Sequence, residues 1–321
     1  MIKKTSFLLY ALIMGLLVLS SSCKKDDANV LAVLTTAEVT GIMRTTAVSG
    51  GDITDDGGAA IIIRGVCWST NETPTINDSK TVDGDGIGSF TSNIKDLEAN
   101  TTYYVRAYAV NSVGTNYGNA FSFTTKDCVD GDGNIYETVI IGNQTWMAEN
   151  LKTTKYSDGL AIPLVTDKDA WLGLTTPGYC WYDHDLTSHA NIYGALYNWY
   201  TVNTDKLCPT GWHAPTNADW TTLITYLGGA EEAGGKLKES GTTHWDEPNQ
   251  GATNESGFTA LPGGMRYNGV FSSMRRTGQW WTATQDDTHT ALAIYLDSAE
   301  SDVMKSENNK TNGFSVRCVK N

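Results

Sequence analysis

Hydrophobic and polar residues follow a strand-like pattern in the first part of the chain. Between residues 34 and 126, short apolar runs are separated by turns, as at Gly84-Asp85-Gly86. The stretch 103–110 repeats with a period of two and has one more apolar side, which predicts a half-buried β-strand. About seven such strands are expected here, which suits an immunoglobulin-like sandwich.

Helical spacing enters only beyond Asp127. Apolar side chains fall at i, i+3, i+4 and i+7 in two stretches, which predicts two helices whose apolar stripes are buried in a core. In the second helix, Thr216 is the expected N-cap and Asp219 completes a capping box. The two stretches consist of Tyr193, Leu196, Tyr197 and Tyr200, and of Trp220, Leu223, Ile224 and Leu227, with Gly228 and Gly229 ending the second.

The sequence predicts strands both before and after these two helices. Residues 135–141 and 144–147 are expected to form a hairpin over Gly142-Asn143. After Gly241 the chain consists of Gly-rich loops and short apolar runs. Nine of the ten tryptophans lie beyond residue 127, so this α+β segment differs in composition from the sandwich before it.

The N-terminus predicts the cellular compartment. Lys3 and Lys4 precede an apolar stretch from Phe7 to Leu19, too short to span a bilayer comfortably and typical of a signal peptide. Small residues leading to Cys23 resemble a lipobox, although Ser20 stands where Leu is usual, and an ordinary signal peptide is the alternative. Acylation of Cys23 would anchor the mature chain.

The residues that follow Cys23 indicate on which side of the membrane the protein is displayed. Lys24, Lys25, Asp26 and Asp27 resemble the export tag of Bacteroidetes lipoproteins, although a solvated tether would have the same composition. We expect an outer-membrane lipoprotein that faces the cell exterior.

Composition supports two domains of ordinary size in 321 residues. With 32 Gly and 18% charged residues, the chain favours turn-rich β structure. Its net charge of −13 argues against a nucleic-acid partner, since phosphate binding requires a basic face. We expect a signal peptide at 1–22, a tether at 23–33, a sandwich at 34–126 and the α+β domain at 127–321.

Five cysteines remain after the lipidation site. Cys67 lies in an apolar run and is expected to be a buried free thiol. The other four allow three pairings, between which the sequence does not choose. They are Cys128, Cys180, Cys208 and Cys318.

Three motifs of the first domain resemble those of a known family: RGVCWST (64–70), TTYYVRAYAVNSVGTNYG (101–118) and FSFTT (121–125). They are similar to the fibronectin type III-like modules of Bacteroidetes surface proteins. Leu97, Thr101 and Tyr103 form the L-x-x-x-T-x-Y pattern of a tyrosine corner, in which the hydroxyl caps a loop backbone. Such modules mostly serve as spacers.

Five motifs of the second domain also resemble those of a known family: ETVIIGNQTWMAENLKTTKY (137–156), YGALYNWYTV (193–202), LCPTGWHAPTNADWTTL (207–223), GATNESGFTALPGG (251–264) and GFSVRCVKN (313–321). Over residues 128–321 they resemble the Fibrobacter succinogenes major paralogous domain. The family is similar in plan to the C-type lectin-like fold and to formylglycine-generating enzymes, and has no established shared activity. The lectin-like resemblance implies a Cys208–Cys318 disulfide, with Cys128–Cys180 as the remaining pair.

Neither catalysis nor calcium binding is expected. None of the five histidines has a metal-ligand spacing, no G-x-S-x-G motif is present, and no cofactor is implied. Residues 130–134 begin like a calcium loop but lack its later ligands, so a turn is expected. Glu247-Pro248-Asn249 matches the tripeptide of mannose-type lectins, but the partner W-N-D motif is missing.

Calcium-independent recognition remains, and we expect it on the long-loop face at residues 242–276. Aromatic and Arg side chains suit glycan or protein contacts. The alternative is that the aromatic rings pack inward and the Arg side chains are solvated, in a structural envelope or adhesion protein without a small ligand. The candidate binding residues are Trp245, Arg266, Tyr267, Arg275 and Arg276.

Overall fold

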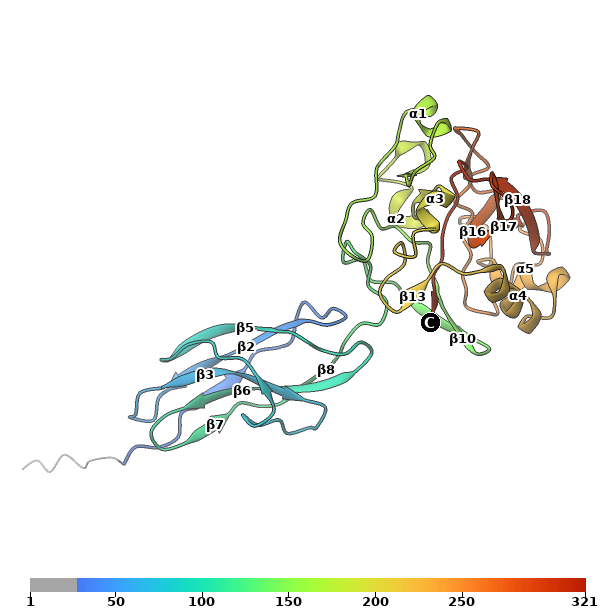
Figure 1. Ribbon diagram of the computed structural model, residues 1–321. Helices are drawn as coiled ribbons and strands as arrows, with labels where there is room; N and C mark the ends of the chain where they lie inside the picture. The colour runs from blue at the N-terminus through green and yellow to red at the C-terminus, as the bar shows by residue number, and fades with distance from the viewer. Residues whose placement is uncertain (1–27) are drawn as a thin grey trace, which may run out of the picture.

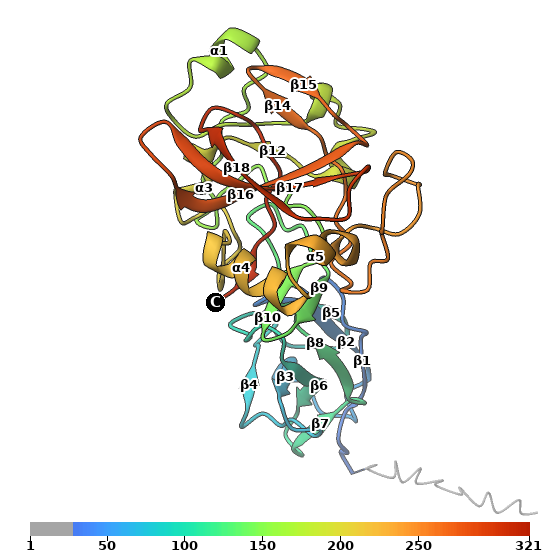
Figure 2. The same cartoon turned by 90° about the vertical axis from the view of Figure 1, so that its right-hand side faces the viewer.

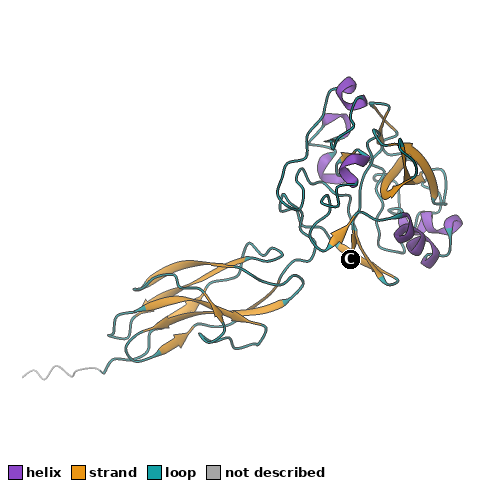
Figure 3. Cartoon of the chain, in the orientation of Figure 1, coloured by secondary structure: helices purple, strands orange, loops and turns teal. Residues whose placement is uncertain are grey.

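The computed structural model describes residues 28–321, which form two domains joined end to end (Figure 1). The signal peptide, Cys23 and the acidic-basic residues after it lie outside the described residues. Strands dominate the first domain, whereas loops with short helices and strands make up most of the second (Figure 3).

The first domain is a sandwich of two antiparallel sheets. One sheet has the order β1-β2-β5, and the other has the order β4-β3-β6-β7 with β8 also paired to β6. This division of sequential strands between two sheets is that of a fibronectin type III-like sandwich. The strands are β1 (Val33–Thr36), β2 (Ala47–Asp55), β3 (Ile63–Ser69), β4 (Ser79–Lys80), β5 (Gly88–Ile94), β6 (Thr102–Val110), β7 (Thr115–Tyr117) and β8 (Phe121–Thr124).

The sandwich core follows from the period-two pattern. Val66, Val105 and Ala107 are fully buried between the sheets. The tyrosine corner is confirmed, because the Tyr103 hydroxyl accepts a hydrogen bond of 3.1 Å from the backbone N–H of Glu98. Cys67 is a buried free thiol, as expected.

The second domain combines several small sheets with five short α-helices and one 3₁₀ helix within residues 127–321. Two antiparallel sheets have the orders β13-β19-β10-β9 and β16-β17-β18. The chain's last strand pairs with one of the domain's first, so both ends of the domain meet in one sheet. The strands are β9 (Thr138–Ile141), β10 (Gln144–Met147), β13 (Trp212–His213), β16 (Thr277–Gln285), β17 (Thr290–Asp297), β18 (Met304–Asn309) and β19 (Val319–Lys320).

Two further strand pairs and the helices cover these sheets (Figure 2). β11 (Tyr179–Cys180) pairs with β12 (Leu196–Tyr197), and β14 (Met265–Tyr267) pairs with β15 (Val270–Ser272). The helices are α1 (Lys168–Leu172), α2 (Ala190–Tyr193), α3 (Trp199–Val202), α4 (Asn217–Tyr226), α5 (Ala230–Leu237) and the 3₁₀ helix η1 (Tyr182–His184).

The predicted helix at 216–227 is confirmed as α4, and both hydrogen bonds of its capping box are present between Thr216 and Asp219. The predicted helix at 193–200 is wrong. Gly194, at φ 77°, ends α2, and an added Cβ there would lie 2.7 Å from the carbonyl oxygen of Leu151. The next residues form β12, which is buried on both faces, so helical spacing arose without a helix.

The tryptophans of the second domain are core residues, which the helical pattern had predicted for Trp220. All nine are at most 6% exposed. Trp146, Trp220 and Trp280 pack in one cluster, and Trp281 packs on Phe314 in another. Several buried indole N–H groups donate to loop carbonyls, as Trp171 does to Thr311 at 2.6 Å. The tryptophans therefore hold the loops together, and no more than 6% of any of them is exposed.

The cysteines are only partly as expected. Cys208 and Cys318 form the predicted disulfide, with Cα atoms 5.9 Å apart. The remaining pair is wrong, because Cys128 and Cys180 are both buried free thiols. Cys128 belongs to the cluster around Trp281, whereas Cys180 packs with Trp171 in a separate cluster.

The junction between the domains is held by Arg44 of the sandwich. Its Nη1 donates to the carbonyl oxygen of Asp127 at 2.8 Å and lies 3.8 Å from the Asp127 carboxylate. Lys320 on β19 pairs with the same carboxylate at 2.8 Å. A backbone hydrogen bond from Lys126 to Met43 adds to these contacts.

Candidate functional site

The structure divides the predicted binding residues of the loop face into buried and exposed groups. Trp245 is fully buried, and its Nε1 donates to the carbonyl oxygen of Ala260 at 2.9 Å. Arg266 is 1% exposed. The prediction that these two side chains contact a partner is therefore wrong, because neither reaches the surface.

Arg266 instead holds together the end of the domain farthest from the sandwich. Its guanidinium lies 4.5 Å from the ring centre of Trp171 and 5.0 Å from that of Phe271. Its Nη atoms donate to three successive backbone carbonyls, those of residues 165, 166 and 167, at 2.8, 2.9 and 3.2 Å. The planar donor fork thus fixes the loop before α1 to the β14–β15 hairpin.

Tyr267 is the predicted aromatic residue that is exposed. It is 48% exposed at the end of β14, next to the Asn268-Gly269 turn, whose two residues both have positive φ. Val270 across the turn and Leu172 at the end of α1 are 51% and 41% exposed. Leu172 lies close to the turn, because an added Cβ at Gly269 would be 3.1 Å from its side chain. The elements that carry these residues, α1, β14 and β15, lie at the end of the domain opposite the sandwich (Figure 2), and Tyr267, Val270 and Leu172 are here called the distal tip.

The last two predicted residues lie at the surface in different settings. Arg275 is turned toward the 242–246 loop, where its Nε lies 3.1 Å from Asp246 and its Nη1 donates to the carbonyl oxygen of Thr243. The Arg276 side chain is 67% exposed and lies 3.6 Å from an Asp297 oxygen. Of the two, Arg276 has the more accessible guanidinium.

Histidines and tyrosines also line this loop face, although the sequence pattern had not indicated them. His189 lies edge-on to Tyr182, with ring centres 5.5 Å apart, and His244 lies edge-on to Tyr193 at 5.8 Å. The Nδ1 of His244 is 2.9 Å from the Glu239 carboxylate. No single segment carries this row, so no local spacing could have revealed it.

The two possible calcium motifs are used for local structure. Asp130 accepts hydrogen bonds from the backbone N–H groups of Asp132 and Asn134, which confirms a turn at 130–134. In the E-P-N tripeptide, the Asn249 side chain is buried and its amide donates to the carbonyl oxygens of Glu239 and Gly241. Among residues 28–321 no group of three or more His, Cys, Asp or Glu side chains could hold a metal ion.

Buried side-chain cations bind the carbonyls of the loops. Lys238 donates to the carbonyl oxygens of residues 250, 297 and 300 at 2.6–2.9 Å, and lies 5.5 Å from the Trp245 ring centre. Lys310 donates to those of residues 287 and 288 while lying 4.8 Å from the Trp199 ring. Arg317 donates to those of residues 258 and 259. Like Arg266, each cation binds loop carbonyls and lies against an aromatic ring.

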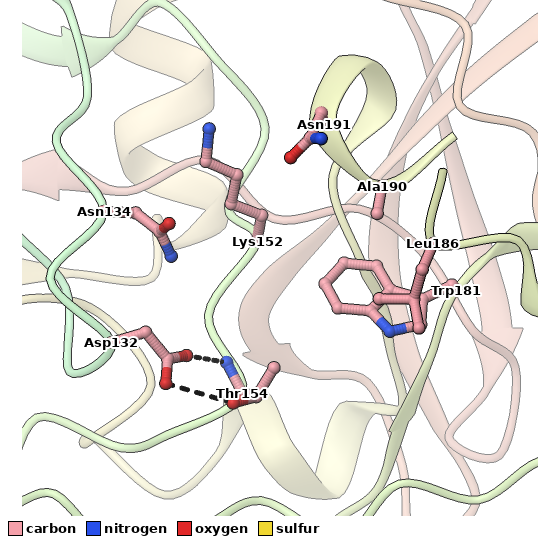
Figure 4. A pocket seen from close by; sticks show the side chains of 8 residues that line it. All are labelled: Asp132, Asn134, Lys152, Thr154, Trp181, Leu186, Ala190 and Asn191. Carbon is pink, nitrogen blue, oxygen red and sulfur yellow. Dashed lines mark hydrogen bonds between the residues drawn. The ribbon is translucent and has the colours of Figure 1, made fainter. Parts of the chain in front are cut away.

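A cavity of about 260 Å³ opens on another part of the second domain (Figure 4). Three segments far apart in the sequence form it, so the sequence pattern did not indicate it. An apolar wall faces a polar one in Figure 4. The lining residues are Asp132, Asn134, Lys152, Thr154, Trp181, Leu186, Ala190 and Asn191.

The polar wall is electrostatically fixed. Partial burial alone would raise the pKa of Asp132, but hydrogen bonds from the backbone and hydroxyl of Thr154 and the nearby Lys155 lower this pKa below its usual value. The carboxylate is therefore ionised, and its Oδ1 lies 3.2 Å from the Lys155 ammonium. Lys152 lies 3.9 Å from Glu149.

Comparisons with solved structures concern the first domain. A fibronectin type III domain of the human KIAA0970 protein is 18% identical, covers 32% of this chain and 78% of its own, and has a TM-score of 0.23. The anti-sigma factor RsgI4 sensor domain of Pseudobacteroides cellulosolvens is 17% identical, with coverages of 30% and 76% and a TM-score of 0.24. The sandwich assignment itself rests on the strand pairing described above.

Comparisons of sequence concern the second domain. No curated protein matches the chain at a significant level. The model of the Fibrobacter succinogenes major domain matches residues 139–320. This range includes all the helices and every strand from β9 to β19, apart from the first residue of β9. The chain therefore belongs to the Fibrobacter succinogenes major domain family.

Proposed function

We propose that this chain is a cell-surface lipoprotein whose C-terminal domain, lectin-like in plan, recognises a glycan or protein partner without metal or catalysis. The observation that carries this proposal is the distal tip. Tyr267, Val270 and Leu172 are each more than 40% exposed there, at the end of the second domain opposite the sandwich. Exposed aromatic and aliphatic side chains grouped on one surface are typical of contact sites.

The tip also has a rigid base. Arg266 binds three carbonyls of the preceding loop and lies against Trp171 and Phe271, so the backbone around Tyr267 is ordered before a partner arrives. A preordered contact loses less conformational entropy on binding. This base supports a recognition role more than that of a passive envelope protein, which remains the alternative.

The lectin-like plan is supported by the Cys208–Cys318 disulfide, which the resemblance implied. Independence from metal is supported by Lys238 and Lys310, whose ammonium groups bind loop carbonyls of the kind that calcium would otherwise coordinate. A cation supplied by the chain itself can hold these loops without a bound ion.

The non-catalytic assignment is supported by the state of the cysteines. An enzyme of the formylglycine-generating type requires reactive thiols, but Cys208 and Cys318 are joined to each other. Burial raises the pKa of the Cys180 thiol to about 12, and burial also raises that of Cys128 far above its usual value. A thiol that stays protonated is a poor nucleophile.

The lipoprotein assignment rests on the sequence of the N-terminus. Residues 28–321 contain no helix with the length and apolar character needed to cross a bilayer. Acylation at Cys23 would tether the sandwich, which would then hold the distal tip away from the membrane. Cys23→Ala should move the protein from the membrane fraction to the soluble fraction. If this variant stays in the membrane and the wild type takes up no acyl label, the proposal of a lipid anchor at Cys23 is wrong.

The recognition role is tested with Tyr267→Ala on a glycan array and on whole cells. We expect binding to weaken by about 1–3 kcal/mol, as at a contact hot spot. The melting temperature should change little, because the side chain is half exposed. Tyr226→Ala is the matched control, since Tyr226 is a 65% exposed tyrosine on α4 at a distance from the tip.

Two results would contradict the proposal. Equal binding by Tyr267→Ala and Tyr226→Ala would remove the tip from the contact surface. Loss of binding on addition of EDTA would restore a metal-dependent mechanism at the E-P-N tripeptide.

A further inference from the structure

The cavity of Figure 4 has an amphipathic lining that the distal tip lacks. Its apolar wall comes from Trp181, Leu186 and Ala190, and Asp132, Asn134 and Thr154 lie opposite. Asn191 lies beside Ala190 on α2. The walls are contributed by the 130–134 turn, the segment after β10, and the segment from η1 to α2. The cavity thus depends on the tertiary fold and lies apart from the residues of the tip.

The apolar wall is firmly held and partly accessible. Trp181 packs edge-on against Tyr179, with ring centres 5.5 Å apart, and only 6% of its surface is exposed. Leu186 is 58% exposed and forms the lip of the cavity. The exposed leucine and the edge of the packed indole together offer apolar surface to a ligand. Because the indole is already ordered, binding there would lose little conformational entropy.

The cavity lining retains hydrogen-bonding groups that the fold does not use. Neither the Asn191 amide nor the Trp181 indole N–H has a hydrogen-bond partner among residues 28–321, although both line the cavity. The Lys152 ammonium lies 3.9 Å from the Glu149 carboxylate and 5.7 Å from the Tyr136 ring centre. Asp132, by contrast, already accepts hydrogen bonds from Thr153 and Thr154 and pairs with Lys155, so it supplies charge to the cavity and few free lone pairs. Donors and acceptors therefore face the same space.

We propose that this cavity binds one pyranose ring of a neutral glycan, an inference that rests on the proposed recognition function. A sugar ring has an apolar C–H face, which suits Trp181 and Leu186, and hydroxyl groups that both donate and accept, which suit Lys152 and Asn191. The cavity is smaller than the roughly 300–1,000 Å³ of sites for drug-sized ligands. It therefore fits a single ring.

Charge favours a neutral sugar over a charged one. The lining contains one carboxylate, Asp132, and one ammonium, Lys152, so its formal charges cancel. An acidic sugar would meet the ionised Asp132, and an amino sugar would meet Lys152. The net charge of −13 also disfavours polyanionic glycans.

The test uses the chain without its first 22 residues, with Cys23→Ser and both domains intact. The probes are glucose, galactose, mannose, xylose and N-acetylglucosamine, each titrated at millimolar concentration. We expect at least one sugar to shift the Trp181 indole N–H resonance saturably in the nitrogen–proton spectrum. Trp181→Phe assigns that resonance by removing it.

Two variants connect the shift to the cavity. Asn191→Ala and Leu186→Asp should each weaken the sugar's affinity about tenfold, because the first removes a hydrogen bond to a hydroxyl and the second an apolar contact with the ring. Asn71→Ala on the sandwich and Ile140→Asp on β9 are matched controls at exposed positions and should leave the affinity unchanged. Melting curves verify that all four variants fold.

The outcomes separate this inference from the proposed function. If none of the five sugars shifts the Trp181 resonance, or if the cavity variants bind like the controls, the cavity is not a sugar site. Array binding that the cavity variants retain but Tyr267→Ala loses would overturn the inference and leave the proposed function standing. A chain that binds neither sugars, arrays nor cells would overturn both.

Discussion

Replacement of Arg266 tests whether one buried cation holds the distal tip in place. The guanidinium donates to the carbonyls of residues 165, 166 and 167, and its Nε lies 3.3 Å from the carbonyl oxygen of Gly269. Arg266→Ala leaves these acceptors without a donor and opens a cavity between Trp171 and Phe271. Each buried acceptor without a partner costs about 1–3 kcal/mol.

The expected total is below the sum of these costs, because water can enter and the loop can relax. We expect Arg266→Ala to lower the free energy of unfolding by about 3–5 kcal/mol, the range for removing a buried charged group that binds its surroundings. For a domain of this size, this corresponds to a fall in melting temperature of about 6–20 °C. Arg266→Lys should lose roughly half as much, since an ammonium keeps the charge without the planar fork.

The assay combines thermal unfolding, followed by near-ultraviolet circular dichroism, with native-state hydrogen exchange. Faster exchange confined to residues 165–172 and 266–271 would show that the tip opens locally. Arg276→Ala is the control, because its side chain is 67% exposed and should contribute less than about 0.5 kcal/mol. If Arg266→Ala melts within 2 °C of this control, roughly the effect of less than 1 kcal/mol, the reasoning about the buried cation is refuted.

Three other results are expected. Reduction of the Cys208–Cys318 disulfide, which closes a loop with a sequence separation of 110, should lower stability by about 4 kcal/mol; an unchanged urea midpoint would contradict this. Burial alone would raise the pKa of Asp219, but hydrogen bonds from Thr216 outweigh this effect and hold the pKa below its usual value, so the ionised carboxylate stabilises the fold above the usual pKa and this effect is lost as the pH falls through the lowered pKa. The difference in unfolding free energy between the wild type and Asp219→Asn should therefore disappear in acid, and a difference that persists there would argue against this origin. Lys238→Met should lower the free energy of unfolding by about 3 kcal/mol, because the loop carbonyls lose their donor. EDTA should leave the wild-type melting temperature unchanged, and a fall on chelation would show that a bound metal ion also stabilises these loops.

The sequence predicted elements wherever a local periodic pattern coincided with one buried face. Alternation in residues 103–110 identified β6, and the Thr216–Asp219 capping box located the start of α4. The same method was wrong at 193–200, because Leu196 and Tyr197 lie in a strand buried on both faces. A segment surrounded by protein carries no polar face from which its period could be recognised.

The candidate site was less predictable from the sequence. In the Gly-rich loops, no period indicates which side of the chain faces the core, so Trp245, Arg266 and Tyr267 looked alike as surface candidates. The structure buries the first two and exposes the third. The signal that could have separated Tyr267 was its position beside the Asn268-Gly269 turn, since such turns lie at the surface.

The sequence by itself determined the two-domain order, the sandwich pattern, the N-cap of α4 and, through its motifs, the family and the Cys208–Cys318 pair. These features depend on neighbours in the chain or on motifs that can be read as they stand. Only the tertiary structure decided which aromatic rings are exposed, that Cys128 and Cys180 remain unpaired, and that Asp132, Lys152 and Trp181 line one cavity. Each of these depends on distances between segments that are remote in sequence, which no local pattern encodes.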